Sequence, residues 1–379
     1  MMKVLFVATV RSHIGQFHMP FITALKQRGC VVHAAFKDNS DEKPGLDLSD
    51  IDKVFEVPFS RSPYSADNIK AYKILKKIID ENGYDAVHCH TPMGSVVTRL
   101  ASKDAAKRGT KVIYTAHGFH FYNGASKKNW LLFYPVEKYL SKYTDCLITI
   151  NQEDYDNAVN RRFKAGKIFK VNGVGVDISK FHPVAREEKS RLRSEYGYSD
   201  NDFILVYPAN LTAGKNHPML FNAVKKVAEK YDFIRLLCPG QEELAPQYKM
   251  MVKELNISDK VEFLGYRRDI EKLVGLSDVS VSASNREGLP VNLIEAMAVG
   301  NAIVATDVRG NRDLVKDGEN GFLISLGDSD AMADRIIKLI ENPDIMDKFK
   351  AQNLTDVKAY STESVIDQMI KIYKELNLI

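Results

Sequence analysis

Two carboxylates eight positions apart, Glu287 and Glu295, flank the segment Gly-Leu-Pro-Val-Asn-Leu-Ile. Glu287 precedes a turn that contains Gly and Pro, and Glu295 falls in the helix that this turn begins. Eight helical residues span about 12 Å, which is comparable to a sugar diphosphate attached to a ribose. Carboxylates accept hydrogen bonds from hydroxyl groups, so the pair suits the sugar-like groups on either side of a diphosphate. A loop acid followed by a solvated helix acid would give the same pattern.

The residues around this pair predict a strand, a helix and a second strand. Residues 279–284 alternate Val or Ala with Ser, Pro290 fits the start of a helix and Gly300 its end, and residues 302–306 are apolar. This order implies a parallel sheet with a right-handed crossover. Ligands bind such sheets at the carboxyl ends of the strands, where the next helix presents free N–H groups. The turn at residues 288–291 is therefore a candidate phosphate cradle.

Strands and helices alternate in both halves of the 379-residue chain, which predicts two doubly wound α/β units in series. Apolar residues make up 45% of the chain and charged residues 27%, as in a globular protein. The polar stretch at residues 180–190 lies near the midpoint, and we interpret it as the linker. Four isolated cysteines fall mostly in apolar runs and indicate reduced core residues of a cytosolic protein.

Several segments resemble the donor half of retaining glycosyltransferase family four: Glu-Gly-Leu-Pro at 287–290, Glu-Ala-Met-Ala at 295–298, Asn-Ala-Ile-Val-Ala-Thr at 301–306, and residues 310–321. The resemblance implies the GT-B fold, an α/β architecture of two Rossmann-like domains facing across a cleft. We expect an acceptor-binding domain at residues 1–178, a nucleotide-sugar-binding domain at 179–361, and a terminal helix at 362–379 that returns to the first domain.

The resemblance also implies roles for single residues. Lys215, on a strand-to-helix loop, matches the family lysine that contacts the donor diphosphate, although a solvated surface lysine is the commoner case. Asn210 stands where the family usually has Arg. His117 matches a histidine that faces the transferred sugar, so Glu287, His117 and Lys215 form the expected catalytic set. Glu295 would hold the ribose, and the remaining donor-binding residues would be Gly15, Gly240, Tyr266, Arg267, Gly288, Leu289, Pro290 and Val291.

Histidines His88, His90, His117 and His120 invite comparison with a metal site. Two of them lie one residue apart at a strand end, and no acidic or cysteine partner completes a known ligand spacing. We therefore expect no metal and no cofactor beyond the donor substrate. Gly15 follows the first strand without a G-x-G-x-x-G pattern, so a dinucleotide site has little support.

The segment from Arg99 to Lys142 holds nine basic residues against two acidic ones, together with a run of aromatic residues. These aromatics could pack into the domain, or they could lie on an anionic membrane surface with the lysines, to which Arg99, Lys103 and Lys107 would add. Within it, residues 119–142 and their Gly-Phe-His-Phe-Tyr start at 118–122 resemble the branch of the family that builds bacterial capsule and exopolysaccharide units. No nucleic-acid motif is present, so we expect no nucleic-acid partner.

The resemblance thus implies a retaining glycosyltransferase that moves a hexose or N-acetylhexosamine from a UDP-sugar to a polyprenyl-diphosphate-linked saccharide, and we expect it to be metal-independent. We expect it to be cytoplasmic and peripheral on the inner face of the cell membrane. A nucleotide-sugar epimerase of the same fold and a noncatalytic glycosyltransferase-like partner subunit are the alternatives.

Overall fold

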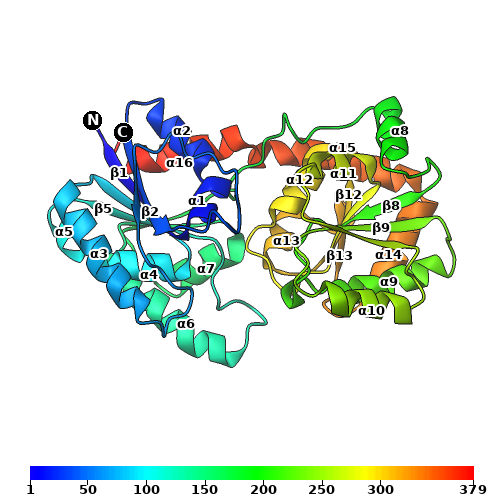
Figure 1. Ribbon diagram of the computed structural model, residues 1–379, viewed down its shortest axis with the longest axis horizontal. Helices are drawn as coiled ribbons and strands as arrows, with labels where there is room; N and C mark the ends of the chain where they lie inside the picture. The colour runs from blue at the N-terminus through cyan, green and yellow to red at the C-terminus, as the bar shows by residue number, and fades with distance from the viewer. The chain divides into compact units, whose positions relative to one another are not determined.

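The computed structural model describes residues 1–379 as two compact units (Figure 1). Unit 1 contains residues 1–175 and 362–379, and unit 2 contains residues 176–361. The chain therefore leaves unit 1 three residues before the boundary expected from the sequence, and it re-enters unit 1 at Thr362. No helix combines the length and the apolar character that a membrane span needs.

Unit 1 is built on a seven-stranded parallel sheet in the order β3-β2-β1-β4-β5-β6-β7. Its strands are β1 (Lys3–Val10), β2 (Val31–Lys37), β3 (Lys53–Glu56), β4 (Ala86–His90), β5 (Lys111–Ala116), β6 (Cys146–Thr149) and β7 (Lys167–Lys170). Its helices are α1 (Arg11–Phe17), α2 (Met19–Lys26), α3 (Asp67–Asn82), α4 (Pro92–Ala101), α5 (Lys103–Lys107), α6 (Lys127–Leu140), the short η1 (Ser141–Tyr143), α7 (Gln152–Asn160) and α16 (Thr362–Glu375).

Both faces of this sheet are buried, because successive side chains of a strand point to opposite faces. Leu5 and Val7 of β1 belong to the core that lies under α3 and α4. Phe6, between them, packs on Phe21 of α2 with the ring centroids 6.2 Å apart. The C-terminal helix α16 covers this second face, where the Tyr373 ring lies 5.1 Å from that of Phe21 (Figure 1).

Unit 2 is built on a six-stranded parallel sheet in the order β10-β9-β8-β11-β12-β13. Its strands are β8 (Phe203–Val206), β9 (Ile234–Pro239), β10 (Val261–Gly265), β11 (Val279–Ser282), β12 (Ala302–Thr306) and β13 (Gly321–Ile324). Its helices are α8 (Arg186–Glu195), the short η2 (Ala213–Lys215), α9 (His217–Ala228), α10 (Ala245–Glu254), α11 (Ile270–Leu276), α12 (Val291–Val299), α13 (Arg309–Leu314), α14 (Ser329–Glu341), α15 (Pro343–Asp356) and the short η3 (Val357–Tyr360).

The predicted strand, helix and strand around residues 279–306 are confirmed as β11, α12 and β12. Pro290 occupies the N-cap of α12, and Gly300 ends the helix with a positive φ of 83°, a conformation that suits glycine. The alternating serines of β11 do not mark an exposed face, since Ser280 and Ser282 are almost fully buried. A parallel strand that carries helices on both faces is covered on both sides.

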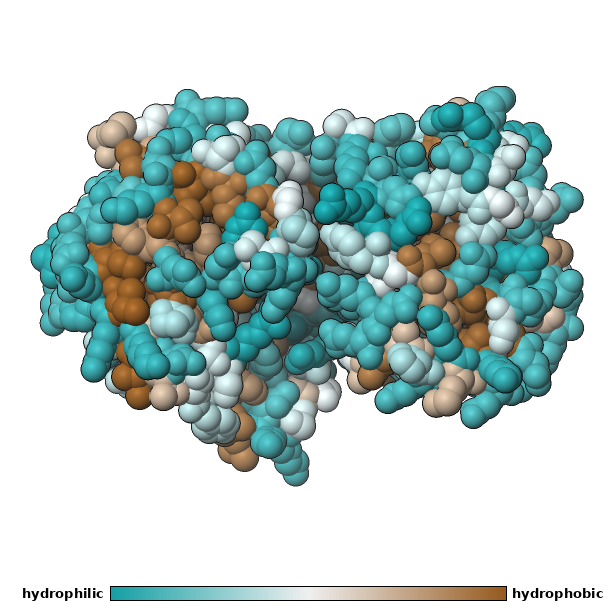
Figure 2. Space-filling model, viewed as in Figure 1, coloured by the Kyte–Doolittle hydropathy of each residue, from teal (hydrophilic) through white to brown (hydrophobic).

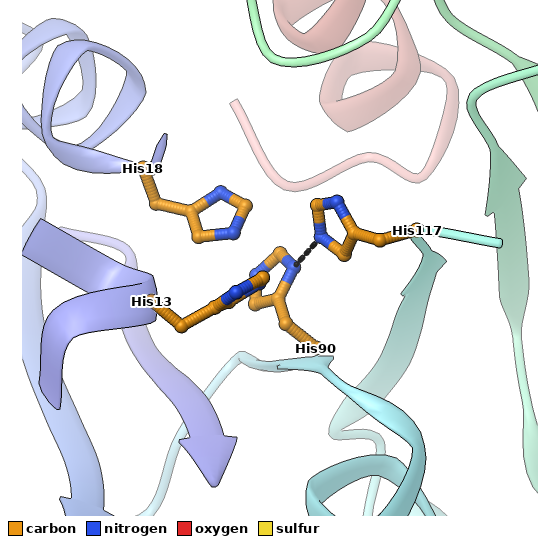
Figure 3. A group of neighbouring side chains, drawn as sticks. All are labelled: His13, His18, His90 and His117. Carbon is orange, nitrogen blue, oxygen red and sulfur yellow. Dashed lines mark hydrogen bonds between the residues drawn. The ribbon is translucent and has the colours of Figure 1, made fainter. Parts of the chain in front are cut away.

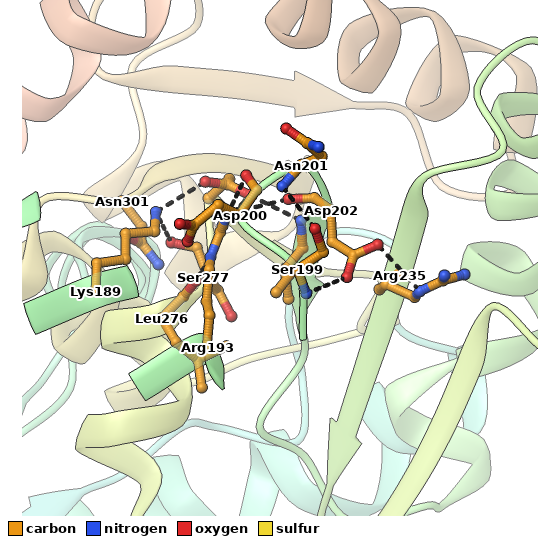
Figure 4. Close-up of polar contacts among 12 residues, drawn as sticks. Lys189, Arg193, Ser199, Asp200, Asn201, Asp202, Arg235, Leu276, Ser277 and Asn301 are labelled. Carbon is orange, nitrogen blue, oxygen red and sulfur yellow. Dashed lines mark hydrogen bonds and ion pairs between the residues drawn. The ribbon is translucent and has the colours of Figure 1, made fainter. Parts of the chain in front are cut away.

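Residues 180–190 do not form the expected free linker. Phe181 is buried, and α8 begins at Arg186 within unit 2. Lys189 and Arg193 of α8 both pair with Asp278, at 2.8 Å and 2.7 Å, in the polar network of Figure 4. These charged side chains therefore anchor α8 beside the start of the central strand β11.

Arg99 is not part of a basic surface. Its side chain is 1% exposed, its Nη2 lies 2.8 Å from Glu137 Oε2, and its guanidinium stacks on the Tyr114 ring. Arg99, Lys103 and Lys107 are four positions apart in the sequence, but they do not share one helix. Helix α4, which carries Arg99, ends at Ala101, and the two lysines lie on the separate helix α5. Arg99 therefore holds α4 to α6 and takes no part in surface charge.

Candidate active site

The carboxyl ends of β8 and β11 lie side by side at the centre of the unit 2 sheet, where the strand order reverses direction. Open parallel sheets bind ligands at such a switch point. The segment after β8 carries Lys215 in η2, and the segment after β11 carries Glu287. The fold therefore brings these two residues together across 72 positions of sequence.

Lys215 Nζ lies 2.5 Å from Glu287 Oε1, with both side chains mostly buried. The Ser284 hydroxyl donates to the same carboxylate oxygen at 2.6 Å. The Tyr207 hydroxyl lies 2.7 Å from Ser284 Oγ and 3.0 Å from the Lys215 carbonyl oxygen. Since the Ser284 proton is directed at Glu287, the buried Tyr207 hydroxyl can donate to either oxygen, and it ties the two loops together.

The turn before α12 is packed tightly from the side. A Cβ on Gly310 would lie 2.4 Å from the Gly288 carbonyl oxygen, so only glycine allows this approach. The buried Arg309 donates from Nε to the Glu287 carbonyl oxygen at 3.0 Å. No side chain caps α12, which leaves its first N–H groups and the positive end of its dipole available to an anion. Sequence reasoning missed Arg309, although its position directly after β12 places it at the same sheet edge.

Glu295 lies one helical turn into α12 and keeps a small exposed fraction. Desolvation raises the pKa of its carboxyl group from 4.5 to about 8, and the more distant Lys180 and Glu271 act in opposite directions. Glu295 is thus mostly neutral at pH 7 in the ligand-free protein.

The other residues expected to bind the donor lie at the neighbouring strand ends. Gly240 follows β9, and a Cβ there would lie 2.0 Å from the Ala209 carbonyl oxygen, so close backbone packing explains this glycine. Asn210 is exposed, and its Oδ1 accepts from the Gln241 N–H at 3.1 Å. The sequence did not foresee this contact, which fixes Asn210 against the β9 loop.

Tyr266 and Arg267 follow β10, and their side chains differ in how freely they could contact a ligand. Tyr266 is 60% exposed. Arg267 instead pairs with Asp269, at 2.8 Å from Nε to Oδ1, and this contact lowers the pKa of Asp269 to about 2. The guanidinium is therefore held within its own loop.

In unit 1, Gly15 lies inside α1 and not in a loop after β1, because the helix starts directly at Arg11. A Cβ on Gly15 would lie 3.1 Å from two side-chain atoms of Leu46, so packing against this residue explains the glycine. His117 follows β5, as the sequence predicts, and it lies among three other histidines: His13, His18 and His90 (Figure 3).

Burial keeps these imidazoles neutral. Desolvation lowers the pKa of His117 to about 4, and it lowers the pKa values of His13, His18 and His90 well below 6.5, assisted by the neighbouring histidines. At neutral pH the cluster therefore offers unprotonated ring nitrogens.

Comparison with known proteins covers both units. The family model "Glycosyl transferases group 1" matches residues 188–355, and the model "Glycosyl transferase 4-like" matches residues 3–151. A Bacillus subtilis (strain 168) protein named "Putative glycosyltransferase EpsD" is 45% identical over 371 residues, which cover 98% of this chain and 96% of that protein. The chain belongs to glycosyltransferase family four.

The glycosyltransferase is also 28% identical over 301 residues to the Escherichia coli UDP-Gal:alpha-D-GlcNAc-diphosphoundecaprenol alpha-1,3-galactosyltransferase, covering 78% of this chain and 76% of that enzyme. The crystal structure of Anabaena Alr3699/HepE in complex with UDP and glucose superimposes with a TM-score of 0.80 at 20% identity, covering 99% and 100% of the two chains. This likeness confirms the predicted fold class, two Rossmann-like units of the GT-B type.

Proposed function

We propose that this glycosyltransferase transfers a hexose or N-acetylhexosamine from a UDP-sugar to a polyprenyl-diphosphate-linked saccharide, with retention of the anomeric configuration. The observation that carries the proposal is the Lys215–Glu287 pair at the carboxyl ends of β8 and β11, directly before the uncapped N-terminus of α12. The UDP named for the E. coli and Anabaena proteins, and the polyprenyl acceptor named for the first, support the donor and acceptor classes. The resemblance to the exopolysaccharide branch agrees with both.

The departing diphosphate gathers negative charge as the glycosidic bond breaks. Lys215 and the N–H groups at the start of α12 would stabilise this charge, since both are held in place before the reaction. These groups supply positive charge without a divalent ion, so we propose that transfer needs no metal on the diphosphate.

The carboxylates would hold hydroxyl groups on either side of that anion. Both hydrogen-bonding contacts of Glu287 described above use Oε1, which leaves Oε2 to accept from a hydroxyl of the sugar. Glu295 would bind the ribose hydroxyls and His117 the sugar. The remaining donor-binding set, Gly15, Asn210, Gly240, Tyr266, Arg267, Gly288, Leu289, Pro290 and Val291, stays a proposal. The departing phosphate oxygen would accept the acceptor proton on the same face of the sugar, so retention needs no covalent intermediate.

We further propose that unit 1 lies on the inner face of the membrane through α6. Four apolar side chains of this helix are exposed and form what we call the α6 surface: Leu131 (76%), Leu132 (44%), Val136 (43%) and Tyr139 (54%). Figure 2 shows hydrophobic atoms on the surface in the region of α6. Lys127, Lys128 and Lys142 are exposed on or next to the same helix, and Lys142 stacks on the Tyr139 ring. The aromatics Trp130, Phe133 and Tyr134 instead pack inward, so the membrane interpretation is proposed only for the exposed side chains of the α6 surface.

The transfer is tested with a panel of radiolabelled UDP-sugars and a polyprenyl-diphosphate-linked N-acetylhexosamine in vesicles that contain EDTA. We expect one sugar to be transferred, and NMR of the product should show an α linkage. Lys215→Met should lower kcat/KM by about 10²–10³, the usual cost of losing one donor to a developing anion. Lys230→Met is the matched control, because it breaks an ion pair with Glu341 on the surface of unit 2. Sugar isomerisation without acceptor would instead establish an epimerase.

Membrane binding has its own test. Leu131→Asp should weaken binding to phosphatidylglycerol vesicles at least about tenfold. It removes one apolar side chain that the membrane would bury, and it adds a negative charge that the anionic lipids repel. Leu326→Asp, at a residue of unit 2 that is 50% exposed, is the control and should leave binding unchanged. Equal loss in both variants would contradict the role of the α6 surface.

A further inference from the structure

The histidine cluster of unit 1 occupies the place where that sheet would bind a ligand. The strand order of unit 1 reverses between β1 and β4, which are neighbours. His13 and His18 follow β1, His90 is the last residue of β4, and His117 follows β5. Four imidazoles therefore converge on the carboxyl edge of the sheet at its switch point, the position that favours ligand binding.

The ring nitrogens are close enough to share one ion. Nitrogen atoms of His13, His18, His90 and His117, one from each residue, all lie within 4.8 Å of one another (Figure 3). His90 Nδ1 and His117 Nε2 are 3.3 Å apart. Two nitrogens at about 2.05 Å from one tetrahedral Zn²⁺ are separated by about 3.4 Å, so this pair already has the spacing of metal ligands.

Hydrogen bonding within the protein accounts for only part of the cluster, namely the contact of His90 Nδ1 with His117 Nε2. The Nε2 atoms of His13, His18 and His90 are buried and have no hydrogen-bond partner. His18 is 7% exposed and His90 is 1% exposed, so water does not readily replace these partners. A buried polar atom without a partner is costly, and a native structure rarely keeps three in one place without a ligand.

His88 and His120, the neighbouring histidines, make other contacts, so they are not part of the cluster. His88 has partners for both ring nitrogens, Tyr373 at 2.9 Å and Thr115 at 2.8 Å. His120 packs on the Phe133 ring, 4.6 Å between centroids. Within unit 1, the buried histidine nitrogens without a partner therefore belong to three of the four residues that converge, whereas His88 has both nitrogens satisfied.

We propose that His13, His18, His90 and His117 bind one late first-row divalent ion, with Zn²⁺ as the best match. Imidazole suits Zn²⁺, Ni²⁺ and Cu²⁺, whereas Mg²⁺ and Ca²⁺ require oxygen ligands that the cluster lacks. The rings must move inward by about 1 Å to reach tetrahedral geometry. His13 and His117 are only half-buried, so an ion can enter from their side.

Metal binding has a consequence for transfer, which rests on the function proposed above. A His117 nitrogen that ligates the ion cannot also hydrogen-bond to the donor sugar. Zn²⁺ is therefore an inhibitor that competes for His117, and the metal-free chain is the active form. This agrees with a transfer that needs no metal on the diphosphate.

The site is tested on full-length protein without a histidine tag, stripped with EDTA and freed of the chelator. Titration with Co²⁺ should give the intense visible bands of a tetrahedral site at one ion per chain, and Zn²⁺ should displace them. His13→Gln and His90→Gln should each weaken Zn²⁺ binding by tenfold or more. His13 is half-buried, so its variant should keep the fold even if the His90 variant does not, and circular dichroism checks this. His182→Gln, an exposed histidine of unit 2, is the control and should bind as the wild type does.

The outcomes separate this inference from the proposed function. If the wild type binds no Co²⁺ or Zn²⁺, or if His13→Gln binds as tightly as the wild type, the metal site is refuted, while transfer in EDTA still supports the function. If Zn²⁺ binds but no UDP-sugar is transferred, the site stands and the proposed function fails. Zn²⁺ that binds without slowing transfer would refute the competition for His117.

Discussion

The raised pKa of Glu295 makes the affinity for a nucleotide sugar depend on pH. If each oxygen of Glu295 accepts a hydrogen bond from one ribose hydroxyl, Glu295 must bind as the carboxylate, since a neutral carboxyl group accepts strongly only through its carbonyl oxygen. With a pKa of about 8 in the free protein, binding has to release the proton that Glu295 holds at neutral pH. Affinity should therefore rise as the pH rises toward 8.

The size of the effect follows from the fraction of Glu295 that is ionised before binding. With a pKa of about 8 this fraction is about 1% at pH 6 and about half at pH 8. If only the carboxylate binds, the association constant rises about 50-fold over these two pH units. In Glu295→Gln the association constant should be low and flat over the same range.

The assay is calorimetric titration of a UDP-sugar between pH 6 and 8.5. A UDP-sugar is preferable to UDP, because a terminal phosphate titrates near pH 6 itself. Repeating the titration at pH 7 in two buffers of different ionisation enthalpy should show nearly one proton released per chain. An association constant that does not change with pH in the wild type, or an equal pH dependence in Glu295→Gln, would refute this role of Glu295.

Stability gives an independent check of the same carboxyl group. The native pKa lies above the unfolded value of 4.5, so the native state binds the proton more tightly than the unfolded state. The stabilisation that protonated Glu295 gives the native state is complete below pH 4.5 and is lost as the pH rises toward about 8. Over this range the unfolding free energy falls by at most about 1.4 kcal/mol per pH unit. Glu295→Gln should remove this decline.

Three further substitutions test the packing that positions the site. Gly240→Ala should lower the melting temperature and cost about 1–3 kcal/mol, because its Cβ would meet a backbone oxygen at 2.0 Å, whereas Gly214→Ala, with the nearest atom at 3.9 Å, should be tolerated. Arg99→Leu should cost about 3–5 kcal/mol in urea unfolding, because it leaves buried Glu137 unpaired, and adding Glu137→Gln should recover most of the loss. Tyr207→Phe should cost about 1 kcal/mol and weaken UDP binding less than tenfold in calorimetry, since the hydroxyl only ties the two loops together.

The strand, helix and strand around Glu287 were predictable because their signals are local. Pro290 and Gly300 bound one helix, and Glu287 precedes it, so a window of about 30 residues holds strand, helix, strand and site. The contact between Lys215 and Glu287 was within reach as well, because both follow strands of one parallel sheet. Its hydrogen-bond support by Tyr207 and Ser284 depends on side-chain geometry, which spacing does not encode.

Arg99 shows how a spacing argument fails. Its interval of four from Lys103 is typical of a solvated helix face, yet its partner Glu137 lies 38 positions away on another helix. A charged residue is buried when a distant carboxylate pairs with it, and a pattern within one helix carries no information about that partner. The prediction of a linker at residues 180–190 was wrong for the same reason, since Asp278 binds the basic side chains of α8.

The histidine cluster needed the order of strands in the sheet, and no spacing along the chain could supply it. His90 and His117 have close sequence neighbours, His88 and His120, that do not belong to the cluster, while its other two members, His13 and His18, lie more than 70 positions away. His88 lies on the same face of β4 as His90, with the ring centroids 4.3 Å apart, but Tyr373 and Thr115 contact both of its ring nitrogens. The order β1-β4-β5 brings the segments after three strands together. In unit 2 the same rule brings Lys215 beside the uncapped start of α12, and these two groups suit an anion. In unit 1 it joins four neutral imidazoles, and that set of side chains suits a cation instead.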